Sequence, residues 1–225
     1  MQPKAFVFDL DGVLTNTDKY HFLAWKQLSE RLGLDFDETV NEKLKGVDRA
    51  TSLEIILSHN GVGNDFSSAE KEKLAAEKNE HYKALIMKMT EDDILPGVVP
   101  FLSTLRENGV KTAVASISKN ASTVLSVLHL ESLFDYVADA AKVANPKPDP
   151  EIFAVCASEL GFEGRDCVGV EDSQSGIEAI TAAGMFSVGI AVDVTSVRPK
   201  LELRSTKELD FERISNAYSA WRNLQ

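Results

Sequence analysis

Cysteine is nearly absent from this chain of 225 residues, which contains Cys156 and Cys167 alone. Two cysteines without a CxxC spacing do not form the disulfide framework of a small secreted domain. We expect both to be buried thiols in a reducing compartment.

Basic residues and long apolar runs are also lacking. Lys and Arg total 24 against 35 Asp and Glu, a formal net charge of −11, which argues against nucleic acid and anionic membranes as partners. No apolar run could span a bilayer, and the first is too short for a signal peptide because Asp9 and Asp11 interrupt it. We expect a cytoplasmic, monomeric protein. A local cluster of cations could still bind a phosphorylated substrate.

Two aspartates end the first apolar stretch, in the run Ala5-Phe6-Val7-Phe8-Asp9-Leu10-Asp11-Gly12-Val13. The stretch predicts a buried strand, and Gly12 allows a tight turn after it. In α/β proteins the chemistry lies at the carboxyl ends of strands, where paired carboxylates need a metal or hydrogen-bond donors to offset their charge. Asp9 and Asp11 could therefore be a nucleophile and a general acid/base. The alternative is a polar turn with a helix cap.

Strand-like and helix-like stretches alternate from residue 95 onward. Further strands are predicted at 110–115, 136–138, 167–170 and 186–190, with helices after 97, 118, 150 and 173. This order predicts an α/β fold, a Rossmann-like parallel sheet of five or six strands flanked by helices.

Residues 17–90 differ, because their apolar spacing predicts helices only. The sequence therefore predicts a core domain at 1–16 and 91–225, with an inserted all-helical cap domain at 17–90 over the carboxyl edge of the sheet. In both domains helix N-caps are expected at Asp37, Asp48, Ser67, Ser118, Asp149 and Ser173.

Lys78 falls on the apolar stripe of the longest predicted helix, in line with Leu74, Tyr82 and Leu85. One interpretation is snorkelling, with a buried stem and an ammonium in water. The other is that Lys78 points into a cleft and meets an anion.

Four polar clusters follow predicted strands or open helices. They are Asp9/Asp11, Ser116-Ile117-Ser118-Lys119-Asn120, Asn145-Pro146-Lys147-Pro148-Asp149-Pro150 and Glu171-Asp172-Ser173. Each cluster alone is weak evidence for a functional site, but a parallel sheet brings the strand ends, and so the clusters, side by side. Together they supply what phosphoryl transfer needs: a carboxylate nucleophile, carboxylates for a metal, a cation, and donors for phosphate oxygens.

These motifs resemble the haloacid dehalogenase-like phosphotransferases: D-x-D-G-V, then S-x-S, a Lys before P-D-P, and E-D-S with a following Gly. The resemblance covers essentially the whole chain. Within the family the motifs are most similar to those of sugar-phosphate mutases. That similarity rests on Thr17, His21, Trp25, Leu44-Lys45-Gly46-Val47, Arg49, Ser52, Lys78-Asn79 and the S-x-S-K-N run.

The resemblance implies a role for each matching residue. Asp9 would be the nucleophile and Asp11 the general acid/base. Mg²⁺ would be held by Asp9, the Asp11 carbonyl and Asp172, with Glu171 nearby. Ser116 and Lys147 would hold the transferring phosphoryl group. Arg49 would anchor the distal phosphate, assisted by Ser118, Lys119 and Asn120, and the cap side would be lined by Thr17, His21, Trp25, Lys45, Gly46, Ser52 and Lys78.

The activity that the resemblance implies is a mutase interconverting β-glucose 1-phosphate and glucose 6-phosphate through an aspartyl-phosphate and a bisphosphate intermediate. A phosphatase of small sugar phosphates would use the same core residues with water as acceptor. A phosphate-binding protein without turnover is a third reading, against which the intact Asp9, Asp11, Lys147 and Asp172 argue. Two positions depart from the expected pattern: Ile117 inside S-x-S, and Asp48 before Arg49.

Overall fold

The computed structural model describes residues 1–44 and 47–224. The backbone forms two compact units, residues 1–16 with 89–225 (unit 1) and residues 17–88 (unit 2). No helix in the described part of the chain has the length and apolarity needed to cross a membrane.

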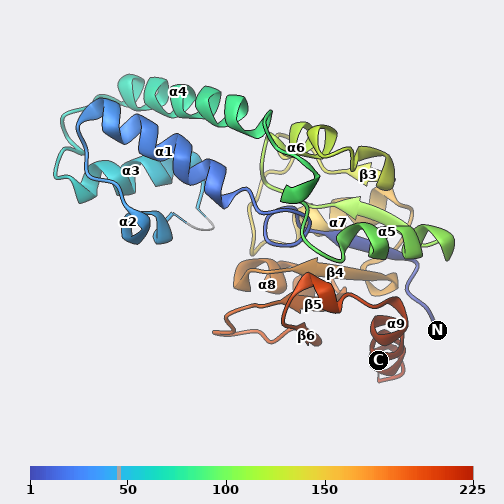
Figure 1. The fold of residues 1–225 in the computed structure, drawn as a ribbon. Coiled ribbons are helices and arrows are strands. Elements are labelled where there is room, and N and C mark those ends of the chain that lie inside the picture. Colours follow the sequence, from blue (N-terminus) through green and yellow to red (C-terminus); the bar gives the residue numbers. More distant parts are fainter. Residues whose placement is uncertain (45–46, 225) are drawn as a thin grey trace. The chain divides into compact units, whose positions relative to one another are not determined.

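Unit 1 contains a six-stranded sheet in the order β3-β2-β1-β4-β5-β6, with every pair parallel (Figure 1). Its strands are β1 (Ala5–Phe8), β2 (Lys111–Val114), β3 (Tyr136–Val137), β4 (Cys167–Glu171), β5 (Phe186–Ile190) and β6 (Leu201–Leu203). Its helices are α5 (Val98–Glu107), α6 (Ala121–Val127), α7 (Glu151–Glu159), α8 (Gln174–Ala182) and α9 (Phe211–Arg222). Single 3₁₀ turns cover Glu91–Asp93, Glu131–Leu133, Gly164–Asp166 and Thr206–Glu208.

The alternation of side chains along β1 explains why helices cover both faces of this sheet. Ala5 and Val7 belong to a buried cluster with residues of α7 and α8, including Phe153. Phe6 and Phe8 contact Phe101 of α5 on the other face, with ring centroids 5.4 and 6.2 Å apart. A central parallel strand buried on both sides reads as a continuous apolar run, as this one does. The predicted α/β fold is confirmed.

Unit 2 consists of helices: α1 (Asp18–Leu32), α2 (Glu38–Glu42), α3 (Arg49–His59) and α4 (Ser68–Ile86) (Figure 1). Helices α1 and α4 pack together, and α3 also packs on α4. Their core includes Trp25, Leu28, Leu53 and Leu57. Apolar residues three and four apart on each helix place these side chains on one face.

Most predicted helix caps are confirmed. Asp37, Asp48, Ser67 and Ser173 each accept a backbone N–H in the first turn of the following helix. The cap at Ser118 is wrong, because α6 begins three residues later and the Ser118 hydroxyl accepts from the Asn120 N–H instead.

Three further details differ from the sequence-based expectation. Asp149 accepts the Glu151 N–H, but Pro150 occupies the N-cap position of α7. On α4 the buried residue after Tyr82 is Ile86 rather than Leu85, because four residues advance a helix by slightly more than one turn. Strand β6 and helix α9 lie beyond the predicted elements.

The sequence of helix α9 contains features that could have predicted it. Asp210 accepts the Arg213 N–H as its cap, and Ile214 and Tyr218 repeat at helical spacing on its buried face. Strand β6 has three residues, too few for a periodic signal. Both cysteines are free and buried, as expected.

Candidate active site

The strand order places a switch point beside β1. From β1 the chain builds β2 and β3 on one side, then β4, β5 and β6 on the other. Ligands of parallel α/β sheets bind at the carboxyl ends of strands where the order reverses. Asp9 directly follows β1, and Glu171 ends the neighbouring β4. The sheet therefore brings two of the four predicted clusters together.

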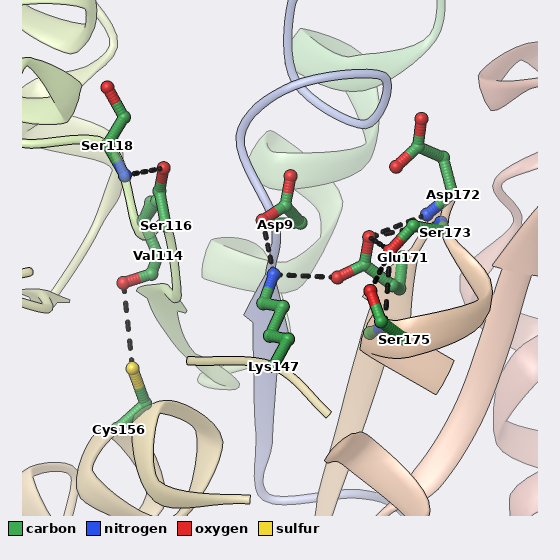
Figure 2. A network of polar contacts seen from close by, with 11 residues as sticks. Asp9, Val114, Ser116, Ser118, Lys147, Cys156, Glu171, Asp172, Ser173 and Ser175 are labelled. Carbon is green, nitrogen blue, oxygen red and sulfur yellow. Dashed lines mark hydrogen bonds and ion pairs between the residues drawn. The ribbon is translucent and has the colours of Figure 1, made fainter. Parts of the chain in front are cut away.

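Lys147 links those two clusters (Figure 2). Its Nζ lies 2.5 Å from Asp9 Oδ1 and 2.7 Å from Glu171 Oε2. All three side chains are largely buried, and burial of an ion pair is tolerable only when the charges compensate one another. The two carboxylates raise the pKa of Lys147 although burial lowers it. Lys147 therefore remains an ammonium that orients Asp9.

Glu171 is hydrogen-bonded through both of its oxygens. Oε2 accepts from Lys147, while Oε1 accepts from the Asp172 N–H, the Ser173 N–H and the Ser173 hydroxyl at 3.0–3.1 Å. A Cβ at position 176 would lie 1.9 Å from Oε2, so only Gly176 leaves room for this side chain. Both oxygens of Glu171 therefore hold neighbouring groups in place, Lys147 on one side and the Asp172 loop on the other.

Asp9, Glu171 and Asp172 each have a carboxylate oxygen within 4.8 Å of the others. Oxygen atoms of carboxylates are the donors that hard divalent cations such as Mg²⁺ prefer, so the donor set fits this class of ion. Asp172 packs against the turn after β1, since a Cβ on Gly12 (φ +75°) would meet its Oδ2 at 1.9 Å. Gly12 thus permits both the turn and the approach of Asp172.

The crowded carboxylates titrate abnormally. Burial, with the charges of Glu171 and Asp11, raises the pKa of Asp9 to about 7 despite the opposing effect of Lys147. Burial and the charges of Glu171 and Asp9 raise the pKa of Asp172 to about 8. Lys147 instead lowers the pKa of Glu171. One cation does not neutralise this group, so protons or a metal ion must supply the remaining positive charge.

The raised pKa values of Asp9 and Asp172 predict that Mg²⁺ stabilises the protein in a pH-dependent way. Between the unfolded pKa of about 4 and these raised values, the native state binds more protons than the unfolded state, so metal-free stability falls as pH rises. A bound metal ion must displace those protons. Its apparent affinity should therefore rise by up to about 10-fold per pH unit for each proton displaced. The rise in melting temperature on adding Mg²⁺ to EDTA-treated protein should be larger at pH 8 than at pH 6. Equal shifts at both pH values, or an unchanged pH dependence in Asp172→Asn, would contradict it.

The segment after β2 carries the predicted phosphate-binding serine. Ser116 is buried, and its Oγ accepts the Ser118 N–H at 3.1 Å (Figure 2). Since this bond uses a lone pair, the Ser116 hydroxyl keeps its proton and can still donate a hydrogen bond. Ile117 and Lys119 are exposed, and Asn120 occupies the N-cap position of α6.

In unit 2, Lys78 is buried and does not snorkel. Its Nζ lies 2.7 Å from His21 Nδ1, 4.7 Å from the Trp25 ring centroid and 5.0 Å from that of Tyr82. Burial and then the charge of Arg49 lower its pKa to about 7. Burial, followed by the charges of Lys78 and Arg49, lowers the pKa of His21 to about 3. Because the pKa of Lys78 is higher than that of His21, the imidazole is neutral and Lys78 donates the hydrogen bond between them.

Tyr82 belongs to this cluster although the sequence prediction assigned it no role. Its ring stacks on His21 with centroids 4.0 Å apart. The helical stripe shared with Lys78 was the available signal. Trp25 is a core residue of unit 2 as well as a face for the ammonium.

The remaining predicted residues of unit 2 are placed as follows. Arg49 opens α3, directly after Asp48, whose carboxylate accepts from the Ala50 and Thr51 N–H groups. The unexpected Asp48 is thus a helix cap. Ser52 donates its hydroxyl to the Asp48 carbonyl at 2.9 Å, and Thr17 is a buried residue at the N-cap of α1. Lys45 and Gly46 lie outside the described residues.

A buried lysine held between the carboxylate that follows β1 and the acidic end of β4 is an arrangement suited to phosphoryl-transfer enzymes. The family model of the haloacid dehalogenase-like hydrolases matches residues 3–184, and the chain belongs to this family.

Individual relatives are similar in sequence to the chain over nearly its full length. It is 40% identical over 219 residues to the β-phosphoglucomutase of Bacillus subtilis, covering 97% of each chain. The crystal structure of β-phosphoglucomutase from Clostridium difficile superposes with a TM-score of 0.88 at 42% identity, covering 97% of this chain and 98% of that one. The phosphorylated carbohydrates phosphatase of Thermotoga maritima is 28% identical over 216 residues, covering 95% and 97%.

Proposed function

We propose that the protein interconverts β-D-glucose 1-phosphate and glucose 6-phosphate, the activity of a β-phosphoglucomutase. Phosphoryl transfer in general is supported by the Lys147 contacts to Asp9 and Glu171. The observation that carries the choice of a mutase is the 40% identity to the Bacillus subtilis enzyme across 97% of both chains.

In this proposal a carboxylate oxygen of Asp9 bonds to phosphorus as the bond from phosphorus to the sugar oxygen breaks. Asp11 gives its proton to that leaving oxygen and later takes one from the hydroxyl that accepts the phosphoryl group. Lys147 fixes the orientation of Asp9, and the hydroxyl of Ser116 donates to a phosphoryl oxygen.

Mg²⁺ is the proposed cofactor, held by Asp9, Asp172 and the Asp11 carbonyl, with Glu171 orienting the loop that carries Asp172. When bound, the ion neutralises negative charge on the phosphoryl oxygens.

Unit 2 is proposed to act as a cap domain that recognises the non-reacting phosphate. It supplies Arg49 and Lys78, two cationic side chains that depress the pKa of His21. A mutase needs such groups because its bisphosphate intermediate carries a second phosphate, which a monophosphate hydrolase lacks.

A phosphatase of small sugar phosphates is the second candidate, favoured by the similarity to the Thermotoga maritima phosphatase. One assay separates the two. Protein, Mg²⁺, β-glucose 1-phosphate and a trace of β-glucose 1,6-bisphosphate are mixed, and glucose 6-phosphate and inorganic phosphate are measured over time. The mutase should give glucose 6-phosphate in large excess. Release of phosphate at the rate of substrate loss would favour the phosphatase.

The Arg49→Ala variant should show which phosphate of the substrate Arg49 binds. If Arg49 binds the phosphate that is not reacting, mutase turnover should fall by about 10²-fold, the loss of a charge-assisted bidentate contact. Phosphorylation of Asp9 by acetyl phosphate, which has no distal phosphate, should change by less than about threefold. Arg49→Lys should recover part of the loss, and Arg31→Ala on the exposed side of α1 serves as control. Equal losses with both phosphate donors would remove Arg49 from this role.

A further inference from the structure

Lys147 lies on an irregular segment between β3, which ends at Val137, and α7, which begins at Glu151. Residues 144–146 and 148 are exposed, and Val143 is the partly buried apolar residue that anchors this part to the core. Packing of apolar side chains therefore does little to fix the backbone of this segment. Since its ammonium must meet Asp9 and Glu171 at 2.5 and 2.7 Å, something else must fix the backbone around Lys147.

Glu151 supplies that restraint. Its Oε1 accepts the Ala144 N–H at 2.9 Å, and its Oε2 accepts the Asn145 N–H at 2.8 Å and the Asn145 side-chain amide at 3.0 Å. Both carboxylate oxygens are thus engaged with consecutive residues just before Lys147. These bonds lower the pKa of Glu151, so the carboxylate stays ionised and keeps accepting at neutral pH.

The other end of the segment is tied to the same residue. The Asp149 N–H donates to the Pro146 carbonyl at 3.0 Å, which closes a turn around Lys147. The Asp149 carboxylate in turn accepts the Glu151 N–H at 2.9 Å. Residues before and after Lys147 are therefore both fastened to the first residue of α7.

We propose that Glu151 is a positioning residue for phosphoryl transfer, which acts by clamping the 144–149 segment so that Lys147 reaches Asp9 and Glu171. It has no contact with the reacting carboxylate in this arrangement and works through Lys147. The inference rests on the proposed phosphoryl transfer at Asp9, but it holds equally for a mutase and a phosphatase.

A purely structural role must be separated from this one. Glu151 is also an acidic residue in the first turn of α7, where it stabilises any helix by interacting with the macrodipole. That effect changes the melting temperature but is independent of Lys147. Coupling between Glu151 and Lys147 is therefore the distinguishing quantity.

The experiment measures the single-turnover rate of Asp9 phosphorylation by acetyl phosphate with saturating Mg²⁺. Glu151→Ala should lower this rate about 10-fold, since a small displacement of an orienting group is costly. Glu151→Gln, which keeps one acceptor oxygen, should lose about threefold. Glu159→Ala, an exposed residue at the far end of the same helix, is the matched control and should stay within about twofold. In a Lys147→Ala background, Glu151→Ala should have no further effect on the rate.

Amide hydrogen exchange gives a readout that does not depend on activity. The Ala144 and Asn145 amides should exchange faster in Glu151→Gln than in the wild type, and unchanged exchange would overturn the clamp. An equal loss of rate with and without Lys147, or no loss in either Glu151 variant, would overturn the positioning role. If Glu151→Ala does not fold, the isosteric Glu151→Gln carries the same comparison. A wild type that acetyl phosphate fails to phosphorylate would contradict the proposed function, and the exchange measurement would then decide the clamp by itself.

Discussion

Asp9→Asn should abolish turnover, leaving less than about a hundredth of the wild-type rate, because the residue that forms the covalent bond is lost. The amide is a poor nucleophile and a weaker metal ligand than the carboxylate. It also removes the negative charge that faces the Lys147 ammonium at 2.5 Å. Both half-reactions should fail, so neither a sugar phosphate nor acetyl phosphate should phosphorylate the protein.

Two measurements check this expectation. Glucose 6-phosphate formation reports turnover, and acid-quenched protein treated with labelled acetyl phosphate reports the aspartyl-phosphate. Asp139→Asn, an exposed aspartate of the same unit, is the control and should be labelled like the wild type. A variant Asp9→Asn that kept more than about a hundredth of the rate would rule out covalent catalysis by Asp9. Retained melting temperature would show that the loss is chemical.

Much of unit 1 follows from its sequence because local and long-range signals agree there. Polar residues lie at or just after the carboxyl ends of the largely buried strands β1, β2 and β4, and parallel pairing brings those ends to one edge. The neighbourhood of Asp9, Ser116 and Glu171 was therefore predictable from strand positions alone.

Lys147 is different, because nine residues separate it from the end of β3 at Val137 and it belongs to no periodic element. The strand order predicted that its cluster would lie near Asp9, but the role of Lys147 itself was expected only from the family resemblance. The engagement of both Glu171 oxygens could not be foreseen either, since hydrogen-bond saturation depends on side-chain geometry rather than on spacing. The same holds for the Glu151 clamp.

For Lys78, periodicity predicted the face of the helix and left two interpretations open. Its helical position indicated the apolar stripe, where the side chain could either snorkel or point into a cleft and meet an anion. The structure instead offers a hydrogen bond to His21 and two aromatic faces, which together replace water around the ammonium. A sequence pattern cannot show that such partners converge from α1 and α4.

Asp11→Asn should lower mutase turnover by about 10²–10⁴-fold, the range that proton transfer by a positioned side chain supplies. Asp11 is partly exposed in the turn after β1, and its charge helps to raise the pKa of both Asp9 and Asp172. Because its proposed metal contact is the backbone carbonyl, the variant should bind Mg²⁺ with nearly wild-type affinity.

The proton-transfer role predicts a difference between phosphate donors. A sugar oxygen leaves poorly without a proton, whereas acetate is a good leaving group that needs little assistance. Asp9 phosphorylation by acetyl phosphate should therefore fall much less in Asp11→Asn than phosphorylation by the sugar bisphosphate. The comparison uses single-turnover rates at saturating Mg²⁺, with the Mg²⁺ affinity measured separately by calorimetry. Equal losses with both donors would exclude Asp11 as the general acid. A large loss of Mg²⁺ affinity with little change in rate at saturating Mg²⁺ would make it a metal ligand instead, because the side chain would then act on the ion rather than on the proton.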